Sequence, residues 1–340
     1  MPNDRKYVNQ LASGEAVDQV FLVRDKDLRT TRKGDFYIVC TLCDRTGGIT
    51  ARMWQATESI YQGIPKGGFV QVRGRVEDYR GTLQMIVEGC RPVPAEKVDL
   101  SEYLLTTERD VDEMWNELLE FLRPIKDKPL KLLLRKFVQD RELVAAVKRA
   151  PAAMEMHHPF IGGLVEHTLN LARCAEALLK LYPELNADLV RAGVFLHDLG
   201  KSAEMSATTN IQYTDRGQLV GHITIAAIWV QQKADAVAAE TGEAFPPATL
   251  NLLQHIILSH HGVYEYGSPK LPAVPESFFI HYLDNLDAKM WMTANAIKND
   301  PDPASRFTGY VRALETRIYK HSLGEEATAD PADDTGKLFK

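Results

Sequence analysis

Hydrophobic and polar residues alternate with a period of two along the N-terminal part of the chain, which predicts strands with one face on a core. Five such runs occur, at residues 17–25, 36–44, 49–54, 69–79 and 82–88. Gly47-Gly48 and Gly81 mark turns, and the polar stretch 55–62 can hold a short helix before the fourth strand. Five strands with a helix in that place are the plan of an OB-fold, a partly open barrel often used on oligonucleotides.

Positive and aromatic side chains occupy positions of these strands that are expected to face outward. Single-stranded nucleic acid is bound by this combination, through its phosphates and its stacked bases. Arginine and tyrosine are also ordinary solvent-facing strand residues, so the set as a whole, more than any member, indicates a binding face. The set is Arg52, Trp54, Arg73, Arg75, Tyr79 and Arg80.

Cys40 and Cys43 form a C-x-x-C pair within the second expected strand. Residues three apart in a strand point to opposite faces, and neither Cys90 nor Cys174 completes a second pair. A zinc or redox site needs convergent thiols, so the pattern predicts core packing for both residues.

The apolar spacing changes to three and four residues in the rest of the chain, which is typical of helices. Short helices are expected within residues 95–150, packed on the second domain, and longer ones at 163–181, 187–199, 220–240, 248–261 and 276–296, with no strand-like alternation between them. The chain is therefore expected to be multidomain. An N-terminal all-β OB-fold barrel (1–94) and a linker with connecting helices (95–150) precede an all-α helical bundle (151–321) and a disordered tail (322–340).

Length and composition agree with this organisation. A chain of 340 residues exceeds the usual single domain, and 45% hydrophobic with 25% charged residues excludes a disordered, collagen-like or disulfide-scaffold protein. No apolar run is long enough to span a bilayer, so no membrane partner is expected. The polar N-terminus and the four cysteines predict an intracellular, cytoplasmic location.

Charge and histidine are unevenly distributed. The net charge is −6, yet residues 1–94 carry 14 Lys and Arg against 11 Asp and Glu. All ten histidines lie at or after His157. The first part is therefore mildly basic, and the second is acidic and rich in imidazole.

Each of the five longer expected helices presents an imidazole or a carboxylate toward the interior, within or at the end of its apolar stripe. One inward histidine is more often a hydrogen-bonded core residue than a ligand, and one His-Asp dipeptide is expected by chance. Five helices with such groups would be costly to bury unless the groups were paired or bound a cation. Imidazole and carboxylate suit Mn, Fe, Co, Ni or Zn, and the absence of thiolate argues against structural zinc. The groups are His167, His197, Asp198, His222, His260, His261, Asp284 and Asp287.

The order of these residues resembles that of the HD-domain metal-dependent phosphohydrolases. The local strings that carry the resemblance are HHPFIGGLVEH ending at His167, HDLGK from His197, SHHG from Ser259, and HYLDNLDAK from His281. With the preceding barrel, residues from about 5 to about 320 resemble the YhaM-type 3′-5′ exoribonucleases. The resemblance implies hydrolysis of single-stranded RNA, and also of single-stranded DNA, from the 3′ end with a divalent ion such as manganese.

The resemblance also implies a division of the ligands. His167, His197, Asp198 and Asp284 would hold a first ion, and His222, His260 and His261 a second, with Asp198 bridging. A glutamate that is a further ligand in HD-GYP relatives is replaced here by Gly163. That departure argues against a third metal and against cyclic-dinucleotide activity.

Other residues near these strings are candidates for catalysis or substrate binding. Lys201 either neutralises charge on the phosphate, as a catalytic partner of Asp198, or is a lysine at a helix C-terminus, favoured by the macrodipole. Asp287 is expected to orient a ligand histidine or Lys201. His158 and Gly163 are candidates for phosphate contact, with packing or loop roles equally open. Magnesium joins the candidate ions, and a homo-oligomer is compatible with the sequence.

Four functions account for this pattern to different degrees. The preferred one is an exonuclease whose barrel holds RNA and whose helical domain cleaves the 3′ end. The alternative is an HD-type nucleotide phosphohydrolase that acts on mononucleotides, with the barrel as a regulatory or assembly module. A nucleic-acid-binding protein with an inactive site is disfavoured by the complete ligand set, and a di-iron oxygenase would leave the barrel without a use.

Overall fold

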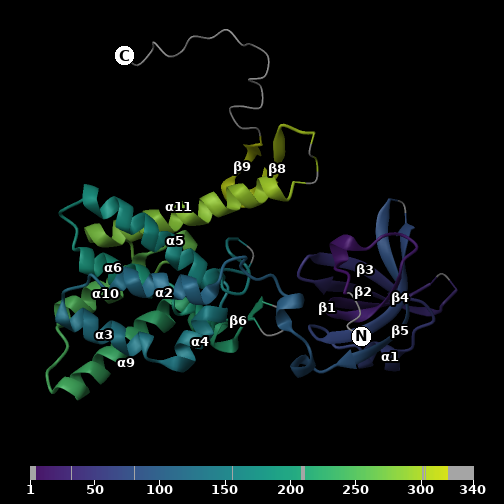
Figure 1. Ribbon diagram of the computed structural model, residues 1–340, viewed down its shortest axis with the longest axis horizontal. Coiled ribbons are helices and arrows are strands. Elements are labelled where there is room, and N and C mark those ends of the chain that lie inside the picture. The colour runs from purple at the N-terminus through teal and green to yellow at the C-terminus, as the bar shows by residue number, and fades with distance from the viewer. Residues whose placement is uncertain are drawn as a thin grey trace, which may run out of the picture. The chain divides into compact units, whose positions relative to one another are not determined.

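The computed structural model describes residues 5–31, 33–79, 81–154, 156–207, 211–300, 302 and 304–320 (Figure 1). The tail predicted to be disordered, 322–340, lies outside these residues, as does Arg80. Two compact units are distinguished, one up to Asp284 and one from Asn285. Within the described ranges, no helix combines the length and the apolar character needed to cross a membrane.

The N-terminal strands close into a five-stranded barrel, which confirms the predicted OB-fold. Its strands are β1 (Ala16–Thr30), β2 (Phe36–Asp44), β3 (Gly47–Met53), β4 (Phe69–Tyr79) and β5 (Thr82–Val93). They are joined in the order β1-β2-β3-β5-β4, and β4 pairs with β1 to complete the closure. Helix α1 (Glu58–Gly63) lies between β3 and β4 in the chain and begins within the polar stretch that predicts it.

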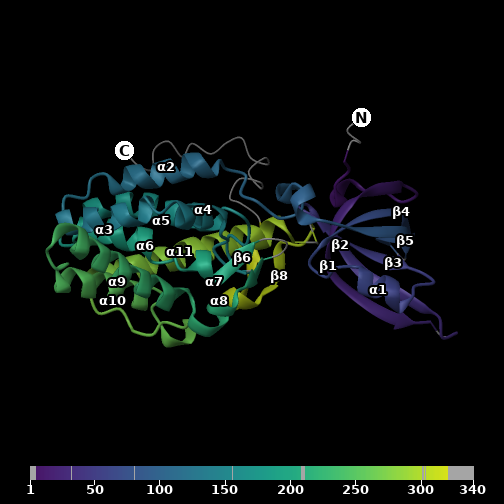
Figure 2. The same ribbon diagram turned by 90° about the horizontal axis from the view of Figure 1, so that it is seen from below.

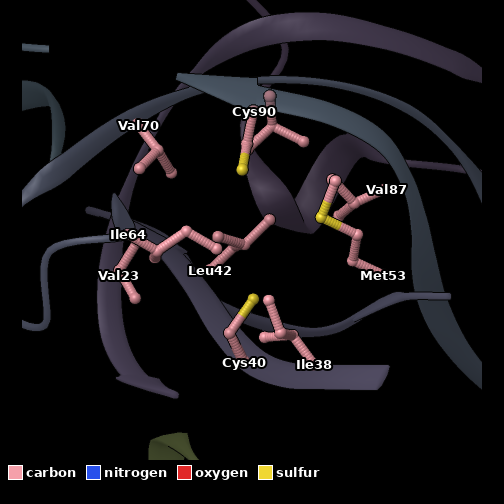
Figure 3. Close-up of a pocket in the computed structure, with 10 residues that line it drawn as sticks. Val23, Ile38, Cys40, Leu42, Met53, Ile64, Val70, Val87 and Cys90 are labelled. Atoms are coloured by element: carbon pink, nitrogen blue, oxygen red, sulfur yellow. The ribbon is translucent and has the colours of Figure 1, made fainter. Parts of the chain in front are cut away.

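Apolar and sulfur-containing side chains fill the barrel interior (Figure 3). Cys40 belongs to this interior cluster, whereas Cys43 packs with Phe69 and Tyr103 in a separate cluster. The predicted core packing of both cysteines, on opposite faces of one strand, is confirmed. Burial raises the pKa of Cys40 to about 12, which keeps its thiol protonated at neutral pH.

Two strands are longer than the alternation pattern predicts. β1 continues to Thr30 and β5 to Val93, because pairing with β2 and β4 holds segments that lack regular alternation. The β4–β5 ladder shifts register between Arg73 and Gly74. A Cβ at Gly74 would lie 2.2 Å from the carbonyl oxygen of Ile86, so only glycine permits this close approach.

Three helices follow the barrel and pack on the helical domain, as predicted. These are α2 (Val111–Leu122), α3 (Lys128–Val138) and α4 (Arg141–Arg149), which begin after the capping residues Asp110, Asp127 and Asp140. Their apolar faces share one hydrophobic core with the later helices, and the rings of Trp115 and Phe195 lie 5.8 Å apart.

The five longer predicted helices are all present. They are α5 (Gly163–Leu178), α6 (Ala187–Leu196), α9 (His222–Thr241), α10 (Pro247–Ser259) and α11 (Pro275–Lys298). Helix α6 packs against both α5 and α10, and α10 packs against α9 (Figure 2). This packing directs one side of each helix toward a shared interior.

The chain between α6 and α9 contains structure that the sequence pattern does not predict. Helix α7 (Lys201–Glu204) leads into a hairpin of β6 (Met205–Ala207) and β7 (Ile211–Tyr213), and helix α8 (Asp215–Val220) follows. The unit from Asn285 has a second hairpin, of β8 (Phe307–Val311) and β9 (Thr316–Tyr319). Strands of three to five residues are too short to show a clear alternation.

Candidate metal centre

The predicted metal-ligating residues come from separate helices and meet in the interior of the helical domain. His167 lies on α5, His197 and Asp198 directly follow α6, and His222 is the first residue of α9. His260 and His261 directly follow α10, and Asp284 lies within α11. Asp198 is 1% exposed, and His167, His197 and His260 are fully buried. The packing of the helices thus brings all seven predicted ligands together.

A first group consists of His167, His197, Asp198 and Asp284, whose ligand atoms all lie within 4.8 Å of one another. The Nε2 atom of His167 is 3.2 Å from Oδ1 of Asp284. The Nε2 atom of His197 is 3.4 Å from Nε2 of His167 and 3.4 Å from Oδ2 of Asp198. Two imidazoles and two carboxylates therefore face one point.

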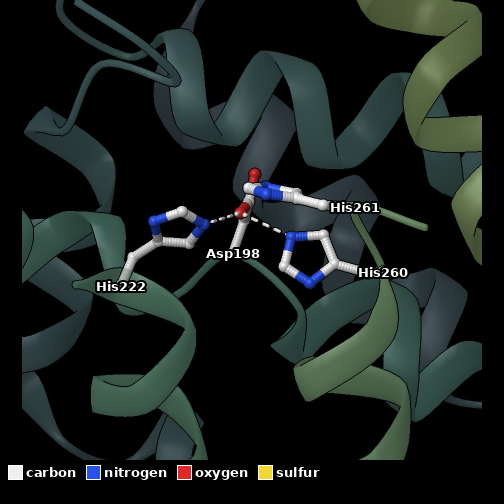
Figure 4. A group of neighbouring side chains, drawn as sticks. All are labelled: Asp198, His222, His260 and His261. Atoms are coloured by element: carbon white, nitrogen blue, oxygen red, sulfur yellow. Dashed lines mark ion pairs between the residues drawn. The ribbon is translucent and has the colours of Figure 1, made fainter. Parts of the chain in front are cut away.

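A second group consists of Asp198, His222, His260 and His261 (Figure 4). The Nε2 atoms of His222 and His260 each lie 3.4 Å from Oδ1 of Asp198. Asp198 is common to both groups, with Oδ2 directed at the first and Oδ1 at the second. The geometry divides the residues in the same way as the family resemblance does.

Backbone carbonyls fix the tautomers of three of these histidines. The Nδ1 atom of His197 lies 2.8 Å from the carbonyl oxygen of Val194, and that of His260 lies 2.8 Å from the carbonyl oxygen of Ile257. The Nδ1 atom of His261 lies 2.7 Å from the carbonyl oxygen of Tyr266. Because a carbonyl only accepts hydrogen bonds, the neutral imidazoles carry their proton on Nδ1. Their Nε2 lone pairs are left for the interior.

The centre contains buried polar atoms that no described residue satisfies. Oδ1 of Asp198, Nε2 of His222 and Nε2 of His260 are buried without a hydrogen-bond partner among the described residues. Lone pairs of imidazole and carboxylate that face one another repel, and unpaired buried polar groups are costly. A divalent cation accepts all of these lone pairs, and His/carboxylate donors suit such an ion. The residues present therefore fit a metal ion.

The protonation states also suit metal ligation, which requires ionised carboxylates and neutral imidazoles. Burial alone would raise the pKa of Asp198, but Lys201 and His197 hold it well below its usual value. Burial would likewise raise the pKa of Asp284, which the hydrogen bond from His167 lowers. Burial lowers the pKa of His261 to about 3, so this imidazole is neutral.

Lys201 is part of the same interior. Its Nζ atom donates a hydrogen bond to Oδ2 of Asp198 at 2.6 Å, and the residue is 6% exposed. Lys201 is the first residue of α7, a helix of four residues, so it also lies in the last turn of that helix, and the alternative explanation, a lysine at a helix C-terminus, stays open. Asp287 lies on α11, one turn after Asp284, and is half-buried.

His158 and Gly163, the candidates for phosphate contact, lie at the start of α5. His158 has a φ of 45° and is 2% exposed. A Cβ at Gly163 would lie 2.1 Å from the carbonyl oxygen of His158. No side chain fits there without a backbone shift, so the glutamate of the HD-GYP relatives has no place in this loop.

Two further histidines lie outside both groups and have structural partners. Nε2 of His255 accepts a hydrogen bond from the backbone N–H of Ala273. Nδ1 of His281 is 2.9 Å from the carbonyl oxygen of His260. The sequence reasoning missed Glu204, which is buried beside His222, because an isolated glutamate six residues after Asp198 carries no spacing signal.

The predicted nucleic-acid face lies on the outer surface of the barrel. Arg52 on β3 and Arg75 on β4 both pair with Ile86 on β5, so they occupy one row across three strands. Arg73 and Arg75 are exposed and alternate with buried residues of β4. The guanidinium of Arg52 lies 5.5 Å from the ring centre of Tyr79. The register therefore gathers these charges and one aromatic ring on a common surface.

Trp54 has an aromatic partner that the sequence reasoning did not identify. Its ring lies 5.0 Å from that of Tyr37 on β2, at an interplanar angle of 31°. Trp54 is 45% exposed and Tyr79 48%. Trp54 directly follows β3, which ends one residue earlier than predicted, and Tyr37 was missed because only the pairing of β2 with β3 brings the two rings together.

Comparison with known proteins agrees with both halves of this structure. The HD domain family matches residues 164–289, and the family of OB-fold nucleic acid binding domains matches residues 22–93. An HD domain with this buried His/Asp cluster indicates divalent-metal binding.

Curated relatives match almost the whole chain. The 3′-5′ exoribonuclease YhaM of Bacillus subtilis is 36% identical over 307 residues, which are 90% of this chain and 95% of the relative. The YhaM of Bacillus velezensis is 34% identical over the same shares of the two chains. That of a Geobacillus strain is also 34% identical, over 90% of this chain and 92% of the relative. With this identity over nearly the full length of both partners, the chain belongs to the family of YhaM 3′-5′ exoribonucleases.

Proposed function

We propose that this protein is a metal-dependent exonuclease that hydrolyses single-stranded RNA from its 3′ end. The observation that carries the proposal is Asp198, a buried carboxylate shared by two groups of candidate ligands. Its Oδ1 atom and the Nε2 atoms of His222 and His260 are buried without a hydrogen-bond partner among the described residues. Family membership supplies the direction of cleavage, because the curated relatives are named 3′-5′ exoribonucleases.

The proposed first ion is held by His167, His197, Asp198 and Asp284, and the second by Asp198, His222, His260 and His261. We propose manganese, with Fe, Co, Ni, Zn and Mg as the other candidates, since hard carboxylate and borderline imidazole donors accept all of them. Two ions held by these groups would supply a nucleophile at neutral pH and would neutralise charge on the phosphate oxygens.

The side chains of this chain have separate tasks in the proposed reaction. Asp198 orients both groups through its two oxygens, and Lys201 holds Oδ2 of that carboxylate. The Lys201 ammonium also adds positive charge where the phosphate gains negative charge during hydrolysis. Asp287 is proposed to orient a neighbouring ligand, and His158, beside the Gly163 turn, to approach the substrate phosphate.

The barrel is proposed to hold the RNA strand. Arg52, Arg73 and Arg75 would contact phosphates, and the exposed rings of Trp54 and Tyr79 would stack on bases. This mode of binding tolerates every base and also accepts single-stranded DNA. The HD site then acts on the 3′ end of a strand that the barrel retains.

Two labelled substrates test the proposal. Purified protein with Mn²⁺ is incubated with single-stranded RNAs of about 20 nucleotides, long enough to fill an OB-fold site, labelled at the 5′ or at the 3′ end. We expect a descending ladder from the 5′ label and immediate release of mononucleotide from the 3′ label, and neither with Asp198→Ala. An equivalent DNA strand tests the second substrate. Hydrolysis of free nucleotides without cleavage of either strand would favour the nucleotidase instead.

A further inference from the structure

Glu204 is a buried carboxylate that the proposed reaction does not use. It is the last residue of α7 and is 8% exposed. Its Oε1 atom accepts a hydrogen bond from the backbone N–H of His222 at 2.9 Å and lies 2.9 Å from Nδ1 of the same residue. One carboxylate oxygen therefore contacts both the backbone and the ring of a predicted metal ligand.

The position of His222 in its helix explains why it needs this partner. His197 and His260 each follow a helix, and their Nδ1 atoms reach a carbonyl three residues earlier. His222 is the first residue of α9, and Gly221, with a φ of 74°, separates it from the preceding helix α8, so its Nδ1 atom contacts Glu204 and not a carbonyl of the preceding turn. Gly221, the N-cap, provides no side-chain cap either. Glu204 supplies both missing acceptors.

The contact also fixes which ring nitrogen of His222 faces Asp198. Oε1 of Glu204 lies 2.9 Å from Nδ1 of His222 and accepts a hydrogen bond from the backbone N–H of the same residue, so Nδ1 is the ring nitrogen that faces away from the metal centre. The Nε2 lone pair is directed at Oδ1 of Asp198, 3.4 Å away.

Two glycines hold the backbones of this pair in place. A Cβ at Gly200 would lie 2.1 Å from the carbonyl oxygen of His222, and a Cβ at Gly217 would lie 2.1 Å from that of Glu204. The chain on either side of Glu204 is thus in direct contact with the start of α9 and with α8. This packing leaves Glu204 and His222 little freedom to separate.

We propose that Glu204 is a positioning residue for the second metal site, which holds His222 with Nε2 toward Asp198 and thereby sets the affinity of that site for a divalent cation. The inference rests on the proposed two-ion centre. His222 differs from His197, His260 and His261 in having a charged partner instead of a carbonyl. A carboxylate behind a ligating imidazole orients the ring and increases its basicity, and loss of such a partner weakens metal binding by about 10- to 100-fold.

The test is a calorimetric titration of the metal-free protein with Mn²⁺ alone. We expect Glu204→Gln to weaken one of two binding events by about tenfold or more, and Glu204→Ala to weaken it further, because the amide keeps an acceptor that alanine lacks. The other event should stay unchanged. The matched control is Glu276→Gln, since Glu276 is also 8% exposed and also accepts a backbone N–H, from Asn186, but is not paired with a ligand histidine.

A double-mutant cycle separates positioning from general destabilisation. His222→Ala should weaken the same binding event, and adding Glu204→Gln to it should weaken that event no further. If Glu204→Gln and Glu204→Ala both bind two Mn²⁺ ions with wild-type affinity, the inference is overturned and the two-ion centre stays intact. An equal loss of Mn²⁺ affinity in Glu276→Gln would overturn the inference in the same way. A wild-type protein that bound only one ion would instead contradict the two-ion centre, and the role of Glu204 with it.

Discussion

The two carboxylate oxygens of Asp198 have different neighbours, and the proposed chemistry depends on this difference. Oδ2 is 2.6 Å from the Lys201 ammonium and faces the first group of ligands, whereas Oδ1 faces His222 and His260. The residue order in the sequence predicts Asp198 as a ligand, but not the separate neighbours of its two oxygens. Lys201 illustrates the same limit, because its position relative to α7 depends on where that short helix begins.

Gly163 permits a prediction at the scale of one residue. Gly163→Ala places a Cβ against the carbonyl oxygen of His158, so the start of α5 must shift. We expect the free energy of unfolding in urea to fall by about 1–3 kcal/mol, the usual cost of overpacking. Gly63→Ala is the matched control, because Gly63 also lies in a helix but has nothing within 4 Å of its Cβ position. Equal stability of the two variants would contradict the close approach.

Helix ends position the capping aspartates and several of the candidate ligand histidines. Aspartates cap α2, α3 and α4. Two predicted ligand histidines, His197 and His260, directly follow helices, and the ring of each contacts a carbonyl of the last helical turn. The sequence indicates these ends through Asp, Pro and Gly. The elements between α6 and α9 are too short to show a clear periodicity, and Glu204 lies among them.

Asp140 tests the contribution of a cap and an ion pair separately. Its side chain accepts a hydrogen bond from the backbone N–H of Leu143 and pairs with Lys233 at 2.6 Å. Asp140→Asn keeps an acceptor for the cap but loses the charge, and should cost less than about 1 kcal/mol at neutral pH. Asp140→Ala loses both, and should cost about 1 kcal/mol more.

The pH dependence of this difference has a definite sign. The hydrogen bond from Lys233 lowers the pKa of Asp140 in the folded protein. The ionised carboxylate therefore stabilises the fold above about pH 4, and this stabilisation is lost as the pH falls further and the carboxylate is protonated. The gap between wild type and Asp140→Asn in urea unfolding should therefore narrow on acidification below pH 4. A gap that widened in acid would contradict the pairing with Lys233.

At the scale of the whole molecule, binding and hydrolysis are assigned to different parts of the chain. The proposed RNA face lies on the barrel, within the region of the OB-fold family match, and the candidate metal centre lies in the HD domain. This separation predicts that the two functions can be impaired independently.

Replacement of Arg73 and Arg75 by alanine tests the separation. We expect weaker binding of single-stranded RNA and a slope of log K against log salt that is flatter by about 1.4, the value for two lost phosphate contacts. Hydrolysis of a small phosphodiester such as a p-nitrophenyl ester should persist. Arg135→Ala with Arg173→Ala is the control, because it removes the same charge from residues paired with Glu240 and Glu117. Normal RNA binding by the barrel variant would show that the face is elsewhere.

The sequence by itself determined the barrel, the longer helices and the seven candidate ligands. Those features repeat at short range: period two in strands, three to four in helices, and His and Asp at recurring places in apolar stripes. It also indicated the burial of Cys40 and Cys43, since alternation alone places them on opposite faces. Local periodicity is encoded in neighbouring residues and can be read without the fold.

Only the tertiary structure decided which of these residues meet. The row of Arg52 and Arg75 depends on strand register, the pair of Trp54 and Tyr37 on strand order, and the contact of Glu204 with His222 on the packing of α7 against α9. The space at Gly163 depends on a carbonyl five residues away. Such contacts join residues without a fixed spacing, because they are set by how the elements pack and not by the sequence between them.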